Sequence, residues 1–236
     1  MHLICRERLL TIPDVRHHLW THRDDLSRCV LGFSGGKDSV ALAKMVQEVN
    51  PDVPLIYVGC PGCEWPEHES FLRQIGVTFI DSGHNWDWFA LNRWAFLHTE
   101  STDAERWAKL HHRGHLRRYA RSGSKVLLWG NRTADGNTVP AVRYAGGDGV
   151  ELWMPLRDLS TAHLNELLSE RDRSPIYRLQ SCRGTGFVSG RLRYGVRPED
   201  RKRDAGACLD ATNMNRFMLL YRDRFDVAVE PSPHCR

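Results

Sequence analysis

Hydrophobic residues occur along this chain in two patterns: short continuous runs, and longer segments in which they recur every three or four positions. The continuous runs predict buried strands over residues 28–33, 55–58, 77–80 and 126–129. The spaced segments predict helices over residues 13–26, 40–49, 67–75, 87–98 and 104–121. Strands that alternate with helices indicate an α/β fold, with a mostly parallel twisted sheet and helices on both faces.

The pattern changes after residue 130. Apolar residues over 141–144 and 150–153 flank a glycine-rich segment, which predicts a hairpin. A further helix is predicted over 161–171, with Ser160 as its N-cap. Beyond Ser174 little regular structure is expected until residues 214–221. We therefore expect one α/β domain over residues 1–180, with helix 13–26 packed on it, and an irregular basic extension of the same domain over residues 181–236.

Composition narrows the class of protein. A chain of 236 residues can bury a core of one domain. It contains no apolar run of the roughly 18 residues that crossing a bilayer requires. Arg6, Glu7 and Arg8 stand where a signal peptide would be apolar. Seven cysteines, an odd number, do not indicate a secreted disulfide framework. A cytoplasmic protein without a membrane partner is expected, and its oligomeric state is left open.

The segment Ser34-Gly35-Gly36-Lys37-Asp38-Ser39 lies between a predicted buried strand and a predicted helix. At such a junction, backbone N–H groups and the positive end of the helix can hold a phosphate. The glycines let the main chain approach the ligand, and the serine hydroxyls and Lys37 add donors. Asp38 can hold Mg²⁺ on the phosphates or fix the loop internally. The segment is not a Walker A loop, because Asp rather than Ser or Thr follows Lys37.

This hexapeptide resembles the PP-loop of the N-type ATP pyrophosphatase superfamily, whose fold is called adenine nucleotide alpha hydrolase-like. Within that superfamily the chain is most similar to the phosphoadenosine phosphosulfate (PAPS) reductase branch. Residues 60–67 stand where that branch has Asp-Thr-Gly followed by Pro-Glu-Thr, and residues 129–132 resemble its Gly-x-Arg segment. Residues 154–156 and 175–177 resemble its Pro-Leu and Leu-Tyr region. The likeness spans about residues 28 to 180.

The resemblance implies a nucleotide-binding domain that takes ATP with Mg²⁺, or alternatively PAPS. It implies that the whole hexapeptide holds phosphates, that Lys37 and Asp38 take part in catalysis, and that Gly62 lies near the nucleotide. It further implies that Arg132 reaches a phosphate or sulfate, a role that suits its fork of donors. The alternative for Arg132 is an arginine of a surface loop.

Two departures from the family concern cysteines. Cys60 replaces the family's aspartate at the end of the second predicted strand, which changes or removes a nucleotide contact. The reductases end in Glu-Cys-Gly-Leu-His, whereas this chain ends in Ser-Pro-His-Cys-Arg. Cys235, beside His234, is either a thiol nucleophile activated by the imidazole or an inert terminal residue.

Cys60 and Cys63 form a Cys-x-x-Cys pair. Two thiols at this spacing can chelate a metal, form a redox disulfide, pass sulfur or serve structure alone. A closed Zn²⁺ site needs four ligands, and Cys182 and Cys208 are the remaining candidates. Resemblance to tRNA-thiolating PP-loop enzymes implies instead a [4Fe–4S] cluster on Cys60, Cys63 and one of these distant cysteines.

Two segments, residues 104–125 and 183–203, each contain seven arginines or lysines. They are either solvated surfaces or a cationic entrance for a polyanion, such as a sulfonucleotide or a nucleic acid. The formal net charge of +4 suits an anionic substrate without selecting one.

Two enzyme classes use such a loop. In the first, ATP is cut between its α and β phosphates, an oxygen of an anionic acceptor (a nucleic acid or nucleoside, for example) is adenylated, and a nitrogen or sulfur nucleophile displaces AMP. In the second, a cysteine thiolate attacks a sulfonucleotide and sulfite is released. A third possibility is a non-catalytic nucleotide-binding module. We favour the first, with a sulfur donor, because the reductases' terminal motif is absent and extra internal cysteines are present.

Overall fold

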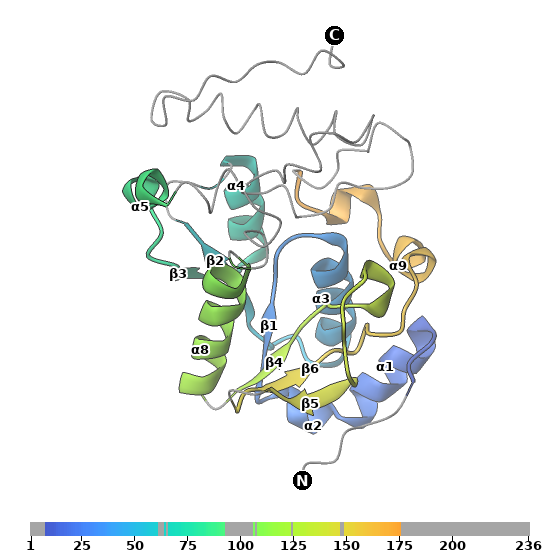
Figure 1. Ribbon diagram of the computed structural model, residues 1–236. Coiled ribbons are helices and arrows are strands. Elements are labelled where there is room, and N and C mark those ends of the chain that lie inside the picture. Colours follow the sequence, from blue (N-terminus) through green and yellow to red (C-terminus); the bar gives the residue numbers. More distant parts are fainter. Residues whose placement is uncertain are drawn as a thin grey trace. The chain divides into compact units, whose positions relative to one another are not determined.

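The computed structural model describes residues 8–60, 64, 66–92, 106, 108–123, 125–146 and 149–175 (Figure 1). Contacts divide the chain into two compact units. The first contains the described residues up to Val58, together with Leu72–Ile80 and Gly114–Arg173. The second contains the described residues of Gly59–Phe71 and of Asp81–Arg113, with Ser174 and Pro175.

Strands and helices alternate along most of the described chain. The strands are β1 (Cys29–Gly32), β2 (Leu55–Gly59), β3 (Thr78–Asp81), β4 (Val126–Leu128), β5 (Arg143–Ala145) and β6 (Glu151–Trp153). The helices are α1 (Ile12–Thr21), α2 (Arg23–Leu26), α3 (Lys37–Val49), α4 (Pro66–Ile75), α5 (Trp86–Leu91), α8 (Gly114–Ser122) and α9 (Thr161–Leu167), with a π-helix over Ala108–Arg113 and 3₁₀ turns over Thr133–Asp135 and Glu170–Asp172.

The strands form one sheet in the order β3-β2-β1-β4-β6-β5. β1 pairs in parallel with both β2 and β4, and β4 pairs in parallel with β6. Only the hairpin strands β5 and β6 run antiparallel among the described pairs. The chain therefore builds outward from β1 through β2 and β3, and then returns to β4 on the other side of β1. This reversal makes the boundary between β1 and β4 the switch point of the sheet.

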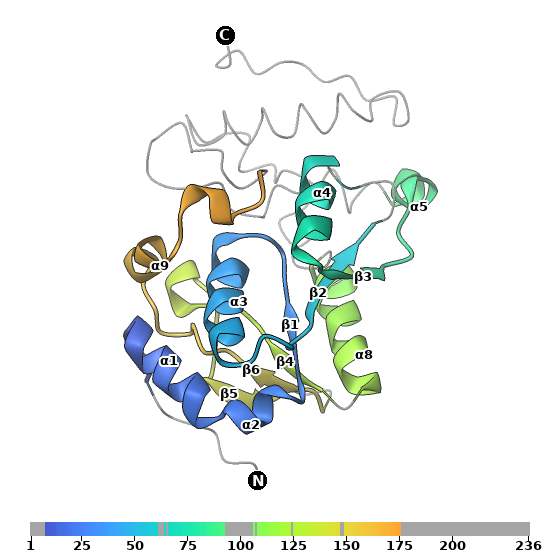
Figure 2. The same ribbon diagram turned by 180° about the vertical axis from the view of Figure 1, so that it is seen from behind.

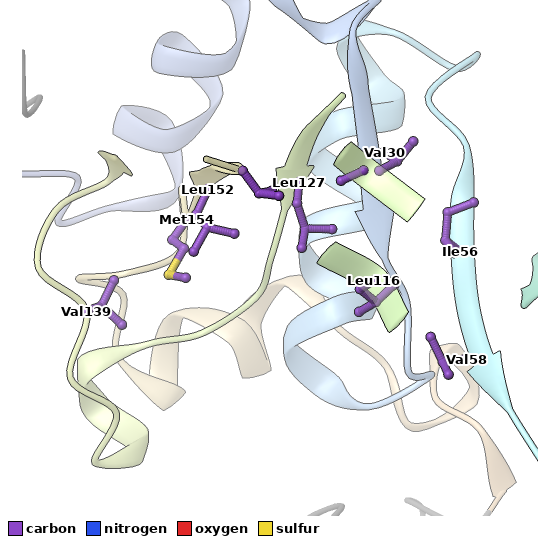
Figure 3. Close-up of a cluster of buried hydrophobic side chains, with 10 residues drawn as sticks. Val30, Ile56, Val58, Leu116, Leu127, Val139, Leu152 and Met154 are labelled. Atoms are coloured by element: carbon purple, nitrogen blue, oxygen red, sulfur yellow. The ribbon is translucent and has the colours of Figure 1, made fainter. Parts of the chain in front are cut away.

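Helices cover both faces of this sheet. α8 lies in front of the strands in Figure 1, and α3 lies in front of them in the reversed view of Figure 2. α1 and α9 pack against α3. On the α8 face, Leu116 and Ala120 join a core cluster with Val30, Ile56 and Leu127 (Figure 3). β1, β2 and β4 are buried along their whole length, which explains why their sequences are continuously apolar.

The predicted fold class is confirmed, and the predicted strands and hairpin are found within two residues of their expected bounds. Three helices differ from the predictions. The helix expected over 13–26 is divided at His22, whose backbone is not helical. α3 begins at Lys37 rather than Val40, because Gly36 is extended and caps it. α9 ends at Leu167, because Leu168 is extended and the Asp172 carboxylate accepts from Ser169 in a separate turn.

The other predicted elements lie partly or wholly outside the described residues. α5 covers the start of the helix expected over 87–98, and the π-helix with α8 covers most of the one expected over 104–121. Residues 181–236, including the segment expected over 214–221, fall outside the described part. In the part that is described, no helix is long and apolar enough to cross a membrane.

Candidate nucleotide site

The loops that leave β1 and β4 meet at the switch point of the sheet, and both belong to the first unit. The loop after β1 is the predicted phosphate-binding segment, Ser34 to Ser39. The loop after β4 contains Gly130, Arg132 and Asp135. Ligands of open α/β sheets bind outside the carboxyl ends of the strands at such a point. The topology therefore brings together two segments that are about a hundred residues apart in the sequence.

The Ser34–Ser39 segment is held by its own serines. The Ser39 hydroxyl accepts from the Ser34 backbone N–H at 3.1 Å and donates to the Gly36 carbonyl at 3.1 Å. The two serine oxygens lie 3.2 Å apart. Gly35 has a φ of 74°, in the left-handed region that glycine adopts without strain. These bonds fix the curve of the main chain from the strand into the helix.

The first turn of α3 presents backbone donors at this loop. The first N–H groups of any helix have no acceptor within the helix. Gly36 is the N-cap of α3 and provides no side-chain cap. Because α3 has thirteen residues, its dipole places partial positive charge at these N–H groups. The geometry is therefore that of an anion site formed by main chain at a helix start.

Lys37 and Asp38, the first two residues of α3, pair with each other. The Lys37 ammonium donates to the Asp38 carboxylate at 2.8 Å and to that of Asp135 at 3.2 Å. The side chains of Lys37, Asp38 and Asp135 are each about one quarter exposed. Both carboxylates are therefore held by a cation while remaining accessible from solvent.

Arg132 lies beneath this pair and is fully buried. Its guanidinium donates to the Asp38 carboxylate at 2.6 Å, to the Asp135 carboxylate at 2.8 Å, and to the Leu159 carbonyl at 3.0 Å. It also lies 3.3 Å from the Thr161 hydroxyl, at the start of α9. Arg132 is thus not a surface arginine. Its contact with a phosphate or sulfate stays a prediction, because in this structure its fork holds two carboxylates.

Asp135 was not foreseen from the sequence. It lies three residues after Arg132, in the 3₁₀ turn Thr133–Asp135 that Gly136 closes with a φ of 76°. An acidic residue in a short turn a few positions after a buried strand is the signal that could have suggested it. With Asp135 included, Lys37, Asp38, Arg132 and Asp135 form one four-membered ion-pair network, which we call the loop network.

Gly130 makes the close approach of the two loops possible. A Cβ atom at this position would lie 3.0 Å from the carbonyl carbon of Asp38 and 3.1 Å from its Cβ. Real Cβ atoms rarely come so close to main chain, so a side chain here would force the first turn of α3 to move. The close contact with Asp38 therefore explains why the Gly-x-Arg segment has glycine at this position.

Cys60 follows β2 directly and belongs to the second unit. Its thiol is buried and lies 3.4 Å from the Ser82 hydroxyl, and its backbone N–H donates to the Glu64 carboxylate at 3.0 Å. In the same unit, the ring of buried His68 lies 2.7 Å from the Ser174 hydroxyl, and burial lowers the pKa of His68 to about 3. The roles predicted for Cys60 remain predictions.

Gly62, Cys63, Cys182, Cys208 and Cys235 lie outside the described residues. The cluster, the zinc site and the terminal nucleophile predicted on them are therefore untested. Among residues that the structure does describe, no group of three or more potential metal-binding side chains (His, Cys, Asp or Glu) is assembled.

A second charged cluster connects α2 with the edge hairpin of β5 and β6. The Arg143 guanidinium donates to Asp25 at 2.5 Å and to Glu151, and it stacks 5.0 Å from the centre of the Trp153 ring. The Trp153 indole in turn donates to the ring of buried His18 at 3.0 Å.

Cys29 lies near this cluster, at the first position of β1. Burial raises the pKa of its thiol to about 12. It is therefore a protonated structural residue at neutral pH.

No family model matches the sequence, and no curated protein matches it. A solved structure does: the NMN synthetase from Francisella tularensis, with a TM-score of 0.51 and 15% identity, over 93% of this chain and 96% of that one. This chain has that fold. Two NAD⁺ synthetases also match with TM-scores of 0.44, a level at which they add nothing to the assignment.

The first of these is the glutamine-dependent enzyme from Acinetobacter baumannii, solved in complex with ADP. It is 18% identical to this chain, over 70% of this chain and 34% of its own length. The second, from Burkholderia pseudomallei, is 16% identical over 92% of this chain and 90% of its own length.

Proposed function

We propose that this chain binds ATP with Mg²⁺ at the Ser34–Ser39 loop and cleaves it between the α and β phosphates. An oxygen of an anionic acceptor attacks the α phosphorus, the bond from this phosphorus to the bridging oxygen breaks, and pyrophosphate leaves. A nitrogen or sulfur nucleophile then displaces AMP from the adenylated acceptor. The observation that carries the proposal is the loop network, which places cations, carboxylates and helix N–H groups together at the switch point.

The described residues divide this work between them. The N–H groups at the start of α3 and the Lys37 ammonium bind the departing phosphates, where negative charge increases in the transition state. To do so, Lys37 exchanges its bonds to Asp38 and Asp135 for bonds to phosphate oxygens. Arg132 keeps both carboxylates in place while this exchange occurs.

The carboxylates fit a magnesium ion. Mg²⁺ in nucleotide sites takes one or two carboxylates together with phosphate oxygens and water. Asp38 and Asp135 offer carboxylate oxygens at the loop, and each side chain is partly open to solvent. When bound, the ion would neutralise charge on the leaving pyrophosphate.

The Francisella protein with the same fold is an NMN synthetase by name, which is compatible with an adenylating synthetase. It also suggests one acceptor to test, the carboxylate whose amide is NMN, with ammonia as the nucleophile. Sulfur transfer remains the alternative second half-reaction. Cys60 would supply or hold the sulfur there, and its buried thiol would first have to become exposed.

The test measures pyrophosphate from ATP-Mg²⁺ in the presence of total RNA, of mononucleotides and of that carboxylate. We expect release that Lys37→Ala and Asp38→Ala abolish. Lys44→Ala is the matched control, because Lys44 lies on the same helix and pairs only with Asp172, at 2.8 Å, among the described side chains. Sulfite released from PAPS, and lost in Cys235→Ser, would overturn the proposal in favour of a reductase. Nucleotide binding without either product would favour a binding module.

A further inference from the structure

Trp153 and His18 form a buried hydrogen bond between the sheet and α1. Trp153 is the last residue of β6 and is fully buried, and His18 is 2% exposed. The indole N–H of Trp153 donates to Nε2 of the His18 ring at 3.0 Å. An indole nitrogen can only donate, so Nε2 of the imidazole must carry a lone pair. Because a protonated imidazole has a hydrogen on both nitrogens, this bond exists only while His18 is neutral.

The other contacts of α1 do not depend on the charge of His18. Val15 and Leu19 are buried on the same side of the helix as His18. Arg16 donates to the Glu48 carboxylate of α3 in two bonds of 2.8 Å, and both side chains are nearly half exposed. Such a pair contributes little to stability and keeps its charges near neutral pH. The bond to Trp153 is therefore a contact through which acid can act on the attachment of α1 to the sheet.

The groups on the hairpin side of α1 do not compensate a positive imidazole. Arg143 of β5 binds the carboxylates of Asp25 in α2 and Glu151 in β6, and Arg28 lies 3.8 Å from Glu151. The two carboxylates are thus matched by two guanidinium groups. Cys29 of β1 is uncharged, because burial raises the pKa of its thiol to about 12. A proton on the imidazole therefore adds charge beside a group of residues whose formal charges already cancel.

The groups on α3 and on α1 itself do not compensate this charge either. On α3, Glu48 is occupied by the ion pair described above, and Lys44 binds Asp172 at 2.8 Å. The centre of the His22 ring lies 4.4 Å from that of His18, and Nδ1 of His22 lies 2.9 Å from the His18 carbonyl, to which it can only donate. Protonation of His22 keeps that bond, whereas protonation of His18 breaks a buried one. The remaining charged or titratable residues of α1 and α2 are exposed to solvent: Asp14, Arg16, His17, Arg23 and Asp24.

We propose that the Trp153–His18 bond is an acid-sensitive latch, which holds α1 on the sheet near neutral pH and releases it when Nε2 of His18 takes a proton from solvent. Two N–H groups then face each other, and the Arg143 guanidinium is already 5.0 Å from the centre of the Trp153 ring. Histidine suits such a switch because its charge ordinarily changes between about pH 5 and pH 8. Since α1 packs against α3, release of α1 uncovers the helix whose first turn contains Lys37 and Asp38. The latch needs no bound nucleotide and does not rest on the proposed function.

The experiment uses the full chain between about pH 7.5 and about pH 5.5, above the range in which carboxylates ordinarily titrate. The indole N–H signal of Trp153 is followed by NMR and is identified by its absence from Trp153→Phe. Hydrogen exchange of residues 12–21 is followed by mass spectrometry and corrected for the intrinsic effect of pH. In the wild type the indole signal should change together with the titration of the His18 ring, and exchange of α1 should rise about tenfold, as for the loss of one hydrogen bond. Exchange of residues 114–122, in α8, should not rise.

His18→Gln is the decisive variant, because its amide oxygen can accept from the indole but does not titrate. Both pH responses should disappear in this variant. His17→Gln is the matched control, since it removes an exposed histidine from the adjacent position and should leave both responses as in the wild type. A response that persists in His18→Gln, or an equal rise of exchange in α1 and α8, would overturn the inference. Should His18→Gln not fold, the wild-type titration decides, because an indole signal that changes without protonation of His18 would refute the latch as well.

Discussion

Two arginines of the first unit are each shared between two carboxylates. Arg132 follows β4 at the switch point and holds Asp38 and Asp135, whereas Arg143 begins the edge strand β5 and holds Asp25 and Glu151. Around Arg132 a second cation, Lys37, joins the carboxylates, and helix N–H groups are adjacent. Arg143 instead stacks on Trp153. The same pairing chemistry therefore builds the candidate nucleotide site in one cluster and fastens α2 to a hairpin in the other.

The largest effect is expected from Arg132→Leu. The substitution leaves two carboxylates with Lys37 as their remaining cation in the loop network and removes the donor to the Leu159 carbonyl. Breaking a buried ion pair from one side typically costs about 3–5 kcal/mol. At 2–4 °C per kcal/mol for a domain of this size, Tm should fall by about 10 °C.

ATP affinity should be lost in the same variant, and Arg132→Lys should restore only part of it, because an ammonium lacks the planar fork. Thermal unfolding and calorimetry measure the two effects. Wild-type ATP affinity in a folded Arg132→Leu protein would show that the network does not position the site.

Arg143→Leu should distinguish the Arg143 cluster from the loop network. Arg143 is partly exposed, and leucine still packs on Trp153, so a loss of about 2 kcal/mol is expected. ATP affinity should stay within twofold of wild type, because no partner of Arg143 belongs to the loop network. Urea unfolding and ATP titration on one sample provide both values. A large fall in ATP affinity would contradict the view that the Arg143 cluster serves stability alone.

Two glycines test whether close approach, rather than backbone freedom, matters at the site. Gly130→Ala should weaken ATP binding severalfold, because the new methyl group forces the first turn of α3 to shift. Gly149→Ala places a side chain at a φ of +81° with open space around it. It should cost about 1 kcal/mol of stability and leave ATP binding unchanged. If both variants bind ATP normally, the inference that Gly130 is needed for the close approach of the two loops is wrong.

The ion pair between Arg143 and Asp25 should also respond to acid. The hydrogen bond from Arg143 lowers the pKa of Asp25, against the opposing effect of burial. A lowered carboxyl pKa gives stability that is present above the unfolded value of about 3.9 and is lost as pH falls through the folded value. Asp25→Asn should therefore show a weaker loss of unfolding free energy between pH 5 and pH 2 than wild type, measured by urea titration. Parallel pH profiles would exclude this contribution.

The smallest effect is expected from Thr161→Val, which removes the hydroxyl 3.3 Å from Arg132 and keeps the volume of the side chain. About 0.5 kcal/mol of stability and a twofold change in ATP affinity are expected, the lower limit for one hydrogen bond. Ser160→Ala is the comparison at the neighbouring position. It removes the cap of α9 and should cost about 1 kcal/mol without affecting ATP.

The sheet and its loop could be predicted from local patterns. β1, β2 and β4 are continuously apolar because both of their faces are covered, and this signal is present in three to five residues. The Ser34–Ser39 loop is recognisable because its donors are adjacent in sequence. Its internal bonds join residues no more than five positions apart.

The loop network, the burial of Arg132 and the break at His22 depend on contacts between distant parts of the sequence, which no local pattern contains. Asp38 and Arg132 are 94 positions apart, and they meet only because β4 inserts beside β1. The burial of Arg132 follows from the same strand order, so its side chain alone did not predict whether it was a surface residue or part of a site. The break at His22 likewise follows from tertiary context, since the sequence around it has an unbroken helical pattern.

The loop network has a kinetic consequence. Its two cations and two carboxylates sum to a formal charge of zero, so the cluster exerts little attraction on a distant nucleotide. If the proposed function holds, the network acts at contact range and governs how slowly a bound nucleotide leaves. Arrival depends instead on the wider field, to which the arginines of α8 contribute. Added salt should therefore slow the capture of the nucleotide more than it hastens its escape.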